Sequence, residues 1–369
     1  MPYHFTGGLQ QGSRWIGFAR FLNESGDGRR RLLERFPSPA AVLDEPTTGL
    51  IKPWREAILS DASEQAKRLP LASWIMTLVD DEYSALLAEC NDAPPTLFGM
   101  GDTSLLGRPA IAIVGTRRPS FDGLRFAQQF AYELARAGFV IVSGLAQGID
   151  AAAHWGALRA GGQTIAVMAT GIDAVYPRVN RSLATVIGKE GLLLSQFLPG
   201  SVALKHHFPR RNRTISGLSL ATLVIEAGSP SGTLITATAA TEQGRDVYVL
   251  PWSITHSMGQ GCLRLLMDGA LLALTPADVI SGIRWQGIAG VNDPPQTSTV
   301  KVKPVSESDI NDADKALLSL IGDGCHAAEE LGSSLKRALP QLLQQLVRLE
   351  IKGLLVRESG GYRQRRDRD

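Results

Sequence analysis

The sequence predicts an α/β protein built on an extended Rossmann-like, doubly wound and mostly parallel sheet, with a helical N-terminal domain and a C-terminal winged helix. Three observations predict this architecture. Six short β-branched runs between residues 110 and 250 alternate with helix-length segments, as in a parallel sheet covered on both faces. The residues before this region mix apolar and charged side chains at helical spacing. The residues at the C-terminal end fit three short helices followed by a hairpin.

Length and composition limit the possible classes of protein. The chain has 369 residues, enough for two or three domains of roughly 100–200 residues each. Hydrophobic residues make up 44% and charged residues 20%, which excludes wholesale disorder. Lysine and arginine number 38 against 36 acidic residues, a formal charge of +2. This balance excludes a histone-like polycation but leaves room for a local basic patch.

Cysteine usage and the N-terminus indicate the compartment. Cys90, Cys262 and Cys325 are far apart and form no CxxC motif, so we expect neither a disulfide framework nor a zinc site. The N-terminus lacks the basic and apolar regions of a signal peptide. No run approaches the ~18 uninterrupted apolar residues of a membrane span. We therefore expect a cytoplasmic protein without a membrane partner.

The first region, residues 1–105, is predicted to be a helical domain of the SAM or helix-hairpin-helix kind. Arg14–Phe21, Arg30–Phe36 and Asp61–Leu69 carry apolar and charged residues at helical spacing. No motif in this region indicates chemistry.

The second region, residues 106–283, is predicted to be the Rossmann-like domain. Its expected strands are Ile111–Val114, Phe139–Val142, Thr164–Val167, Leu192–Leu194, Leu223–Ile225 and Val247–Leu250. Between the first two strands, Leu124, Ala127, Ala131 and Leu134 recur at steps of three and four residues, and Gly138 follows as a C-terminal cap. This segment is therefore predicted to be an amphipathic helix.

The remaining chain is predicted to be a linker, residues 284–308, and a winged-helix-like domain, residues 309–369. Expected helices span Ala313–Ile321, Ala327–Leu331 and Gln341–Ile351, and the hairpin strands are Leu354–Val356 and Tyr362–Gln364. In the last helix the leucines at 342, 343, 346 and 349 are expected to be core. The polar residues Gln341, Gln344, Gln345 and Arg348 could enter a DNA groove, face water or meet a partner protein.

Four glycine-bearing loops follow the predicted strands, at residues 115–120, 143–150, 169–173 and 227–233. Loops at the carboxyl ends of parallel strands share one edge of the sheet, where ligands bind. Glycine lets backbone N–H groups approach an anion, and helix N-termini add positive dipole. We therefore expect a phosphate site whose candidate residues are Gly115, Thr116, Arg117, Ser143 and Gly144. No GxGxxG or Walker A motif is present, and each loop alone could simply be a tight turn.

A basic segment, Lys205 to Arg213, is the most informative stretch of the sequence. Its four fixed cations are accompanied by no acid, and it also contains Phe208 and Asn212. Cations spaced through a short turn suit a polynucleotide backbone, and Phe208 could stack on an unpaired base. The candidate contacts are Lys205, Phe208, Arg210, Arg211, Asn212 and Arg213. Two other interpretations remain open: a solvated loop with Phe208 in the core, or arginines paired with carboxylates elsewhere.

Catalytic patterns are weak. His154 has no serine or cysteine nucleophile in a recognisable elbow, which favours a structural histidine. Glu226 and Glu242 could act as acid and base, but a salt bridge or a cap is the simpler interpretation. Since no HExxH motif or acidic metal cluster occurs, we expect no catalytic residue, no metal and no cofactor.

At these loops the chain resembles the DNA-processing protein A family (DprA, also called Smf). The matching motifs are residues 112–117, 143–150 with His154, 208–219, 226–227, 231–237 and 242–245, of which FPRRNR-x-ISGLS is the most specific. The sequence departs from the family pattern at Gln196, Trp252, Leu263 and Ser84.

The resemblance implies a homodimer that binds and protects single-stranded DNA and loads the RecA recombinase in transformation and recombination, without established catalysis. It also implies that Arg117 and Lys205 belong to the family's positively charged pocket, and that Phe208 and Arg210–Arg213 form its strand-contacting loop.

Two other functions stay open on the sequence. A nucleotide-processing hydrolase of the phosphoribohydrolase type carries a GGxGTxxE loop, which residues 231–236 resemble. Thr236 stands where the catalytic glutamate would be, so stabilising a ribosyl cation and activating water would be difficult. A scaffold that uses the winged helix for protein contacts is the third possibility.

Overall fold

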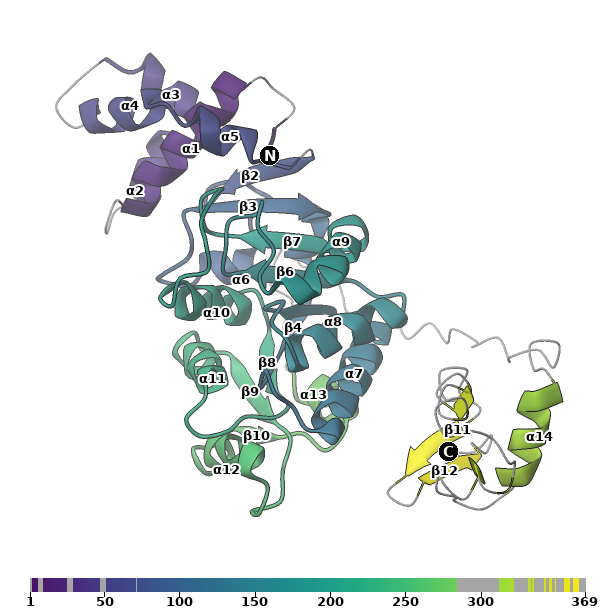
Figure 1. The fold of residues 1–369 in the computed structure, drawn as a ribbon. Helices are drawn as coiled ribbons and strands as arrows, with labels where there is room; N and C mark the ends of the chain where they lie inside the picture. Colours follow the sequence, from purple (N-terminus) through teal and green to yellow (C-terminus); the bar gives the residue numbers. More distant parts are fainter. Residues whose placement is uncertain are drawn as a thin grey trace. The chain divides into compact units, whose positions relative to one another are not determined.

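The computed structural model describes residues 2–5, 9–24, 29–46, 51–70, 72–283 and 312–321, together with short stretches between 331 and 364. The chain divides into two compact units, Met1–Ser298 and Thr299–Asp369. The first unit is an α/β layer structure and the second contains a helix and a hairpin (Figure 1). The predicted linker at 284–308 lies outside the described residues.

A ten-stranded mixed sheet forms the centre of the first unit. Its strand order is β1-β2-β3-β7-β6-β5-β4-β8-β9-β10, with parallel pairing from β7 to β10 and antiparallel pairing from β1 to β7. The six predicted strands correspond to β4 (Ala110–Val114), β5 (Val140–Ser143), β6 (Thr164–Met168), β7 (Leu192–Ser195), β8 (Ala221–Val224) and β9 (Asp246–Val249). β10 (Leu271–Leu272) adds a short parallel edge strand. The predicted doubly wound, mostly parallel sheet is confirmed.

The expectation that residues 1–105 are helical is wrong for their last third. β3 (Thr96–Gly101) pairs antiparallel with β7, β2 (Ser73–Thr77) pairs antiparallel with β3, and β1 (Tyr3–His4) pairs antiparallel with β2. β2 is buried along its whole length and β3 over its first four residues, so neither shows the alternation that marks a half-buried strand. In these two segments of the sequence, only the length of the apolar run and its flanking residues could distinguish a strand from a helix.

Helices surround the sheet. Before β3 lie α1 (Leu9–Glu24), α2 (Arg29–Arg35), α3 (Pro39–Asp44), α4 (Lys52–Leu59), α5 (Ser63–Lys67) and α6 (Ala85–Ala88). Next come η1 (Thr103–Gly107), α7 (Phe121–Arg136), α8 (Ile149–Arg159), η2 (Arg178–Asn180) and α9 (Arg181–Glu190). The rest of the unit contributes α10 (His207–Gly217), α11 (Gly232–Glu242), η3 (Ser257–Gly259), α12 (Gln260–Met267) and α13 (Pro276–Gly282).

The two faces of the sheet bury different hydrophobic clusters. On β4, Ile111 and Ile113 pack in a cluster with residues of α7 and α8, while Ala112 and Val114 pack in a second cluster with residues of α10, α11 and α12. This alternation follows from the two-residue period of a strand. The helix predicted after the first strand is α7, in which Ala127, Ala131 and Leu134 are buried as expected, whereas Leu124, in its first turns, is exposed.

The strand order reverses at β4, which lies between β5 and β8. In open α/β sheets this reversal leaves a crevice between the carboxyl ends of β4 and β8, because the helices that follow these two strands cover opposite faces. The loops after β4 and β8 therefore border the expected ligand position.

In the second unit, α14 (Asp312–Ile321) precedes an antiparallel hairpin of β11 (Leu355–Glu358) and β12 (Gly361–Gln364). Leu342, Leu346 and Leu349 are buried in one cluster with residues of α14 and the hairpin, as expected for core leucines. Gln345, expected on an open polar face, donates a hydrogen bond to Asp314 at 2.9 Å. Most of the other two predicted helices lies outside the described residues, so the winged helix stays a prediction.

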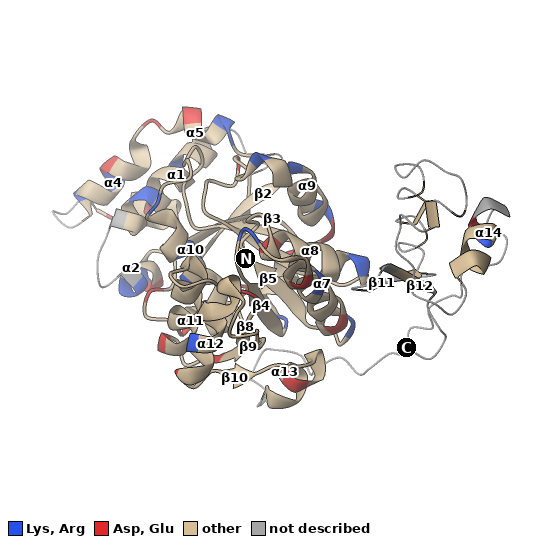
Figure 2. Ribbon diagram, turned by 60° about the horizontal axis from the view of Figure 1, so that its bottom comes forward, with Lys and Arg blue, Asp and Glu red and all other residues tan. Residues whose placement is uncertain are grey.

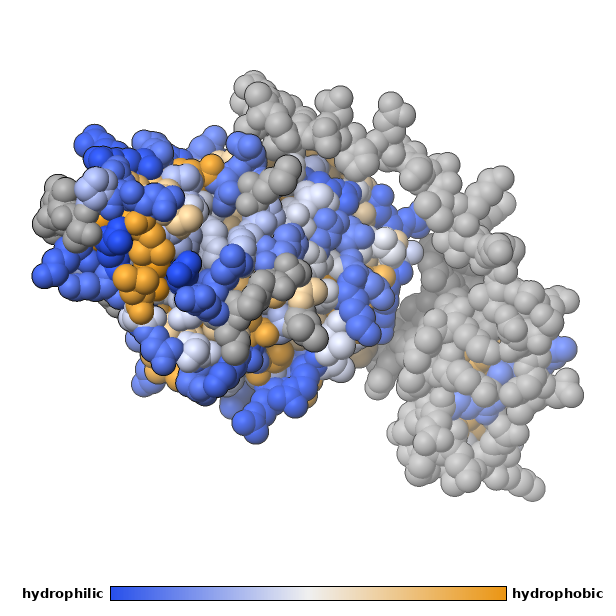
Figure 3. All heavy atoms as spheres, turned by 90° about the horizontal axis from the view of Figure 1, so that it is seen from above, coloured by the Kyte–Doolittle hydropathy of each residue, from blue (hydrophilic) through white to orange (hydrophobic). Residues whose placement is uncertain are grey.

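Seen from the side of the N-terminal helices, the surface of the first unit is mainly hydrophilic, with small hydrophobic strips between (Figure 3). Among the residues that the structure describes, no helix has the length and apolar character needed to cross a bilayer.

Candidate functional site

A hollow of about 220 Å³ lies at the switch point of the sheet. The loops after β4, β5 and β8 contribute to its wall, and helix α10 closes one side. Its charged and aromatic lining residues are Arg117, Asp150, Phe208 and Arg211. A second, smaller hollow of about 60 Å³ shares Arg117, Phe208 and Arg211 with the first and reaches the loop after β6. The four predicted glycine loops thus meet at one edge, together with the basic segment.

The basic segment differs from its prediction as a short turn, because most of it forms helix α10. Successive residues of a helix are rotated by about 100°, so Arg211 and Arg213 lie about 200° apart around its axis. The helix therefore cannot present its three arginines together to one strand of nucleic acid. Arg211 and Arg213 are paired with carboxylates from distant parts of the chain, which was one of the interpretations left open.

Arg211 is a buried cation with only 4% of its surface exposed. Its Nη1 lies 3.7 Å from Oδ2 of Asp150, a carboxylate that also accepts hydrogen bonds from the N–H groups of Gly144 and Ala146. Burial raises the pKa of Asp150 and lowers that of Arg211, while the mutual attraction opposes both shifts. Gly144 leaves room for this pair, because a Cβ there would lie 1.2 Å from the Arg211 Nη1.

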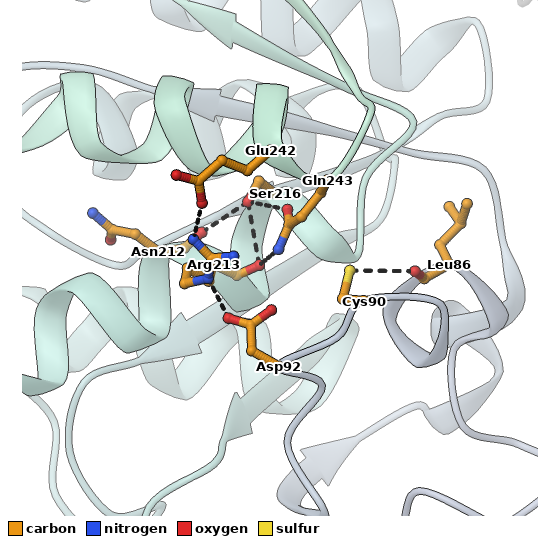
Figure 4. A network of polar contacts seen from close by, with 8 residues as sticks. All are labelled: Leu86, Cys90, Asp92, Asn212, Arg213, Ser216, Glu242 and Gln243. Atoms are coloured by element: carbon orange, nitrogen blue, oxygen red, sulfur yellow. Dashed lines mark hydrogen bonds and ion pairs between the residues drawn. The ribbon is translucent and has the colours of Figure 1, made fainter. Parts of the chain in front are cut away.

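Arg213 takes part in a separate network on the other side of α10 (Figure 4). Its guanidinium contacts Asp92, from the segment after α6, and Glu242, at the end of α11. These hydrogen bonds raise the pKa of Arg213. Its backbone carbonyl accepts a hydrogen bond from Nε2 of Gln243, whose Oε1 accepts one from Ser216 at 2.6 Å. Arg213 therefore joins three segments of the fold and does not line either hollow.

The exposed cations of the predicted set are Arg117, Lys205 and Arg210. The Arg117 guanidinium lies over the ring of Phe208, with its Cζ 4.8 Å from the ring centroid, and Arg210 lies 5.5 Å from the ring centroid of Phe197. Lys205 is exposed in the turn before α10 and does not line either hollow. Phe208 lies between the two hollows, half-buried, and supports Arg117 rather than filling the core.

Several predicted backbone donors are already engaged within the protein. The Thr116 N–H donates to the carbonyl of Glu226 at 2.8 Å, and the Gly144 N–H donates to Asp150. The Ser143 hydroxyl donates to the carbonyl of Ile113 at 2.7 Å. A Cβ on Gly115 would lie 2.5 Å from the side chain of Ile149. These contacts hold the loops together, so Gly115, Ser143 and Gly144 shape the site rather than offer free donors at those atoms.

The N-terminus of α11 and Asn212 complete the larger hollow. Ser231, Gly232 and Thr233 line it, and a Cβ on Gly232 would meet nothing within 4 Å. The Asn212 side chain also lines it and lies 3.5 Å from the Gly232 carbonyl. The hollow therefore combines cations, hydroxyls and a helix N-terminus, a set suited to phosphate.

The residues considered for catalysis have structural partners. His154 is fully buried, its Nδ1 lies 2.7 Å from the Thr164 hydroxyl, and burial lowers its pKa to about 3. Glu226 is fully buried and interacts with Ser120 and His256, whereas Glu242 pairs with Arg213. The simpler interpretation, carboxylates in salt bridges and caps, is therefore confirmed. In the part of the chain that the structure describes, no group of histidine, cysteine or acidic residues could hold a metal ion.

Sequence reasoning missed Tyr176, which lines the smaller hollow from the loop after β6. Its ring centroid lies 6.0 Å from that of Phe208, at an interplanar angle of 65°. A search for aromatic residues within one turn of the glycine loops would have found it.

Comparison with known proteins shows the family of this chain. Residues 74–284 match the model of a family described as DNA recombination-mediator protein A. The DNA processing protein DprA of Streptococcus pneumoniae is 45% identical over 205 residues, which are 56% of this chain and 72% of that protein. Its X-ray structure gives a TM-score of 0.59 at 35% identity, over 75% of this chain and 96% of that one.

A structure of DNA processing protein A from Helicobacter pylori, which describes the single-stranded DNA binding mode of that protein, gives a TM-score of 0.51 at 32% identity. The alignment covers 56% of this chain and 94% of that one. The chain therefore belongs to the DNA recombination-mediator protein A family.

Proposed function

We propose that this chain binds and protects single-stranded DNA at the switch point of its sheet and that it acts there as a recombination mediator without catalysis. The observation that carries the proposal is the larger hollow, where Arg117, the α11 N-terminus and Phe208 meet. The single-stranded DNA binding described for the Helicobacter pylori relative supports it.

The predicted contact residues are proposed to have different roles. Arg117 and Asn212 line the larger hollow and Lys205 and Arg210 are exposed, so we expect these four to contact phosphates, while Thr116 forms part of the wall. Arg211 adds positive potential from inside the wall, partly offset by Asp150, because electrostatic attraction acts across a few ångströms without contact. Since phosphate contacts position a strand without reading its bases, we expect low sequence preference.

The hydrolase alternative receives no support from the hollow. Among its lining residues, all of them in the described part of the chain, Asp150 is the carboxylate, and it is committed to Arg211 and two backbone N–H groups. Thr236 lines the hollow at the position where the phosphoribohydrolase loop has its glutamate. A carboxylate held in this way is poorly placed to activate water.

Loading of RecA and homodimer formation complete the proposal, and both rest on family membership. The sheet edge at β10 supports a dimer, because Met267, Leu271, Leu272 and Leu274 are exposed there. Exposed apolar residues next to an edge strand indicate an interaction surface. Light scattering of Leu271→Asp should give a smaller mass than wild type; equal masses would exclude this edge as the interface.

The first experiment is fluorescence anisotropy of a labelled single strand with a duplex competitor across a salt series. We expect tight binding that prefers single strands. Arg117→Ala and Lys205→Ala should each weaken it and reduce the slope of log K against log salt by about 0.7, the contribution of one phosphate contact.

Two matched variants serve as controls. Arg159→Ala removes an exposed arginine at the end of α8, and Lys189→Ala removes an exposed lysine near the end of α9. Because helices α8 and α9 end away from the carboxyl edge of the strands, neither variant should change affinity or salt slope. Absence of single-strand binding by the wild-type protein, or equal weakening by the controls, would contradict the proposed site.

A further inference from the structure

The two aromatic rings beside the smaller hollow differ in how open they are. Phe208 is half-buried and the Arg117 guanidinium lies over its ring. Arg211 approaches the same ring, with its Cζ 6.0 Å from the centroid. Tyr176 instead has 48% of its surface exposed, and it meets Phe208 at an angle of 65°. A base that approaches this pair therefore finds the more open ring on Tyr176.

The segment that carries Tyr176 is held firmly against the rest of the site. Nδ2 of Asn180 donates to the carbonyls of Leu145 and Ala146, at 2.9 and 3.1 Å, which fixes η2 to the loop after β5. The Gly171 N–H donates to the carbonyl of Ser201 at 2.9 Å, which fixes the start of the segment to the chain before α10. A ring on a fixed backbone loses little conformational entropy when a ligand stacks on it.

Positive charge continues from Tyr176 along the same surface. Arg178 in η2 and Arg181 at the start of α9 are exposed, and neither has a carboxylate within 4.0 Å among the described residues. Lys and Arg segments are visible on α9 in Figure 2. Val179 between them is 64% exposed. The nearest acid in sequence, Asp173, accepts a hydrogen bond from the Gly200 N–H at 2.9 Å. The η2 corner is thus basic, aromatic and apolar together.

The size of the smaller hollow decides how a nucleotide can use this corner. Its volume of about 60 Å³ is far below the roughly 300 Å³ at which ligand pockets begin, so it cannot enclose a nucleotide. A base next to it must remain outside, against the ring at its rim. Aromatic stacking of this kind tolerates any base sequence and requires an unpaired base.

We propose that Tyr176 is a base-stacking residue for single-stranded nucleic acid and that Arg178 and Arg181 contact the phosphates beyond it. Phe208 acts mainly as the platform that positions Arg117. The strand then runs from the larger hollow across Phe208 and Arg117 to the η2 corner. This inference rests on the proposed function, since it extends the same interface by one subsite.

The test compares Tyr176→Ala with wild type on two labelled strands of equal length, one with normal bases and one with abasic sites throughout. On the normal strand the variant should bind about 5- to 150-fold more weakly, the range for loss of one stacked base. On the abasic strand the two proteins should bind equally, because no base is present to stack. Tyr176→Phe keeps the ring and should retain wild-type affinity on both strands.

The remaining variants separate the charge contribution. Arg178→Ala and Arg181→Ala should each reduce the salt slope by about 0.7 on both strands. Phe208→Ala should reduce the salt slope as Arg117→Ala does, because the platform for that guanidinium is lost. Tyr132→Ala, which removes a partly buried tyrosine from α7, is the matched control and should change neither strand's affinity. Thermal unfolding of every variant verifies that it folds.

The possible results distinguish failure of the proposed function from failure of this inference. If wild type binds no single strand, the proposed function itself fails. If wild type binds and Tyr176→Ala binds the normal strand equally well, or loses affinity equally for both strands, the stacking role is overturned while the proposed function stands. Unchanged salt slopes for Arg178→Ala and Arg181→Ala overturn the phosphate contacts at the corner.

Discussion

The cations of the basic segment, Lys205 to Arg213, fall into two groups, one exposed to solvent and one paired with carboxylates. Lys205 and Arg210 are exposed to solvent, whereas Arg211 and Arg213 are held by carboxylates. Arg211 is 4% exposed, and Arg213 bridges segments that are 121 and 29 residues away in sequence. A run of cations is therefore not by itself a nucleic-acid surface. Whether a cation attracts a ligand or stabilises the fold depends on which acid the fold brings to it.

The comparison predicts that paired cations affect stability and exposed cations affect binding. The largest effect is expected for Arg211→Met. This change leaves the Asp150 carboxylate buried without its partner, and breaking a buried pair on one side costs about 3–5 kcal/mol. Urea unfolding of the variant measures the loss.

A double-mutant cycle sharpens this prediction. Arg211→Met combined with Asp150→Asn removes both charges, so it should recover part of the stability that the first change loses. Lys205→Ala, from the exposed group, should unfold at the same urea concentration as wild type. If the Arg211→Met variant is as stable as wild type, the distinction between paired and exposed cations is wrong.

A second effect concerns His154, which is buried beside the same ion pair. Burial lowers its pKa to about 3, and the charge of Arg211 adds to the shift. Because the folded pKa lies below the unfolded value near 6.5, its contribution to stability is present above pH 6.5 and is lost as the pH falls toward 3. His154→Gln should flatten the pH dependence, so that the stability lost between pH 7 and pH 5 is about 2 kcal/mol smaller than in wild type.

Urea unfolding at pH 7, 6 and 5 for both proteins checks this expectation. Other titrating groups are shared by the two proteins and cancel in the difference. Parallel pH profiles would mean that the buried imidazole does not control acid sensitivity.

The smallest effect is expected for Arg213→Met. This side chain is 35% exposed, and ion pairs open to solvent contribute little, so the loss should be about 1 kcal/mol and smaller still at 1 M salt. Its salt slope for single-strand binding should equal that of wild type. If the salt slope of Arg213→Met is smaller than that of wild type, Arg213 contacts DNA and the distinction between paired and exposed cations is wrong for this residue.

Particular residues explain how far sequence reasoning reached. The strands β4 to β9 were predictable because continuous apolar runs and glycine loops are local signals. β2 and β3 were not, because they stand among segments with helical spacing, so a short apolar run there does not distinguish strand from helix. Convergence of the glycine loops with Arg117 and Phe208 followed from the rule that parallel strands share one carboxyl edge. The pairing of Arg211 with Asp150 and of Arg213 with Asp92 was not readable, since each partner is distant in sequence.

The sequence by itself determined the parallel sheet, the edge at which the glycine loops meet and the family. These follow from periodicity and short motifs, which need only neighbouring residues. The tertiary structure alone decided which cations are exposed, which ring is open and which N–H groups are occupied. Coulomb energies and burial depend on the distance between side chains in space, and only the folded chain sets those distances. Asp150 illustrates the difference, because only the fold places it beside Arg211 and turns a predicted DNA contact into part of the wall.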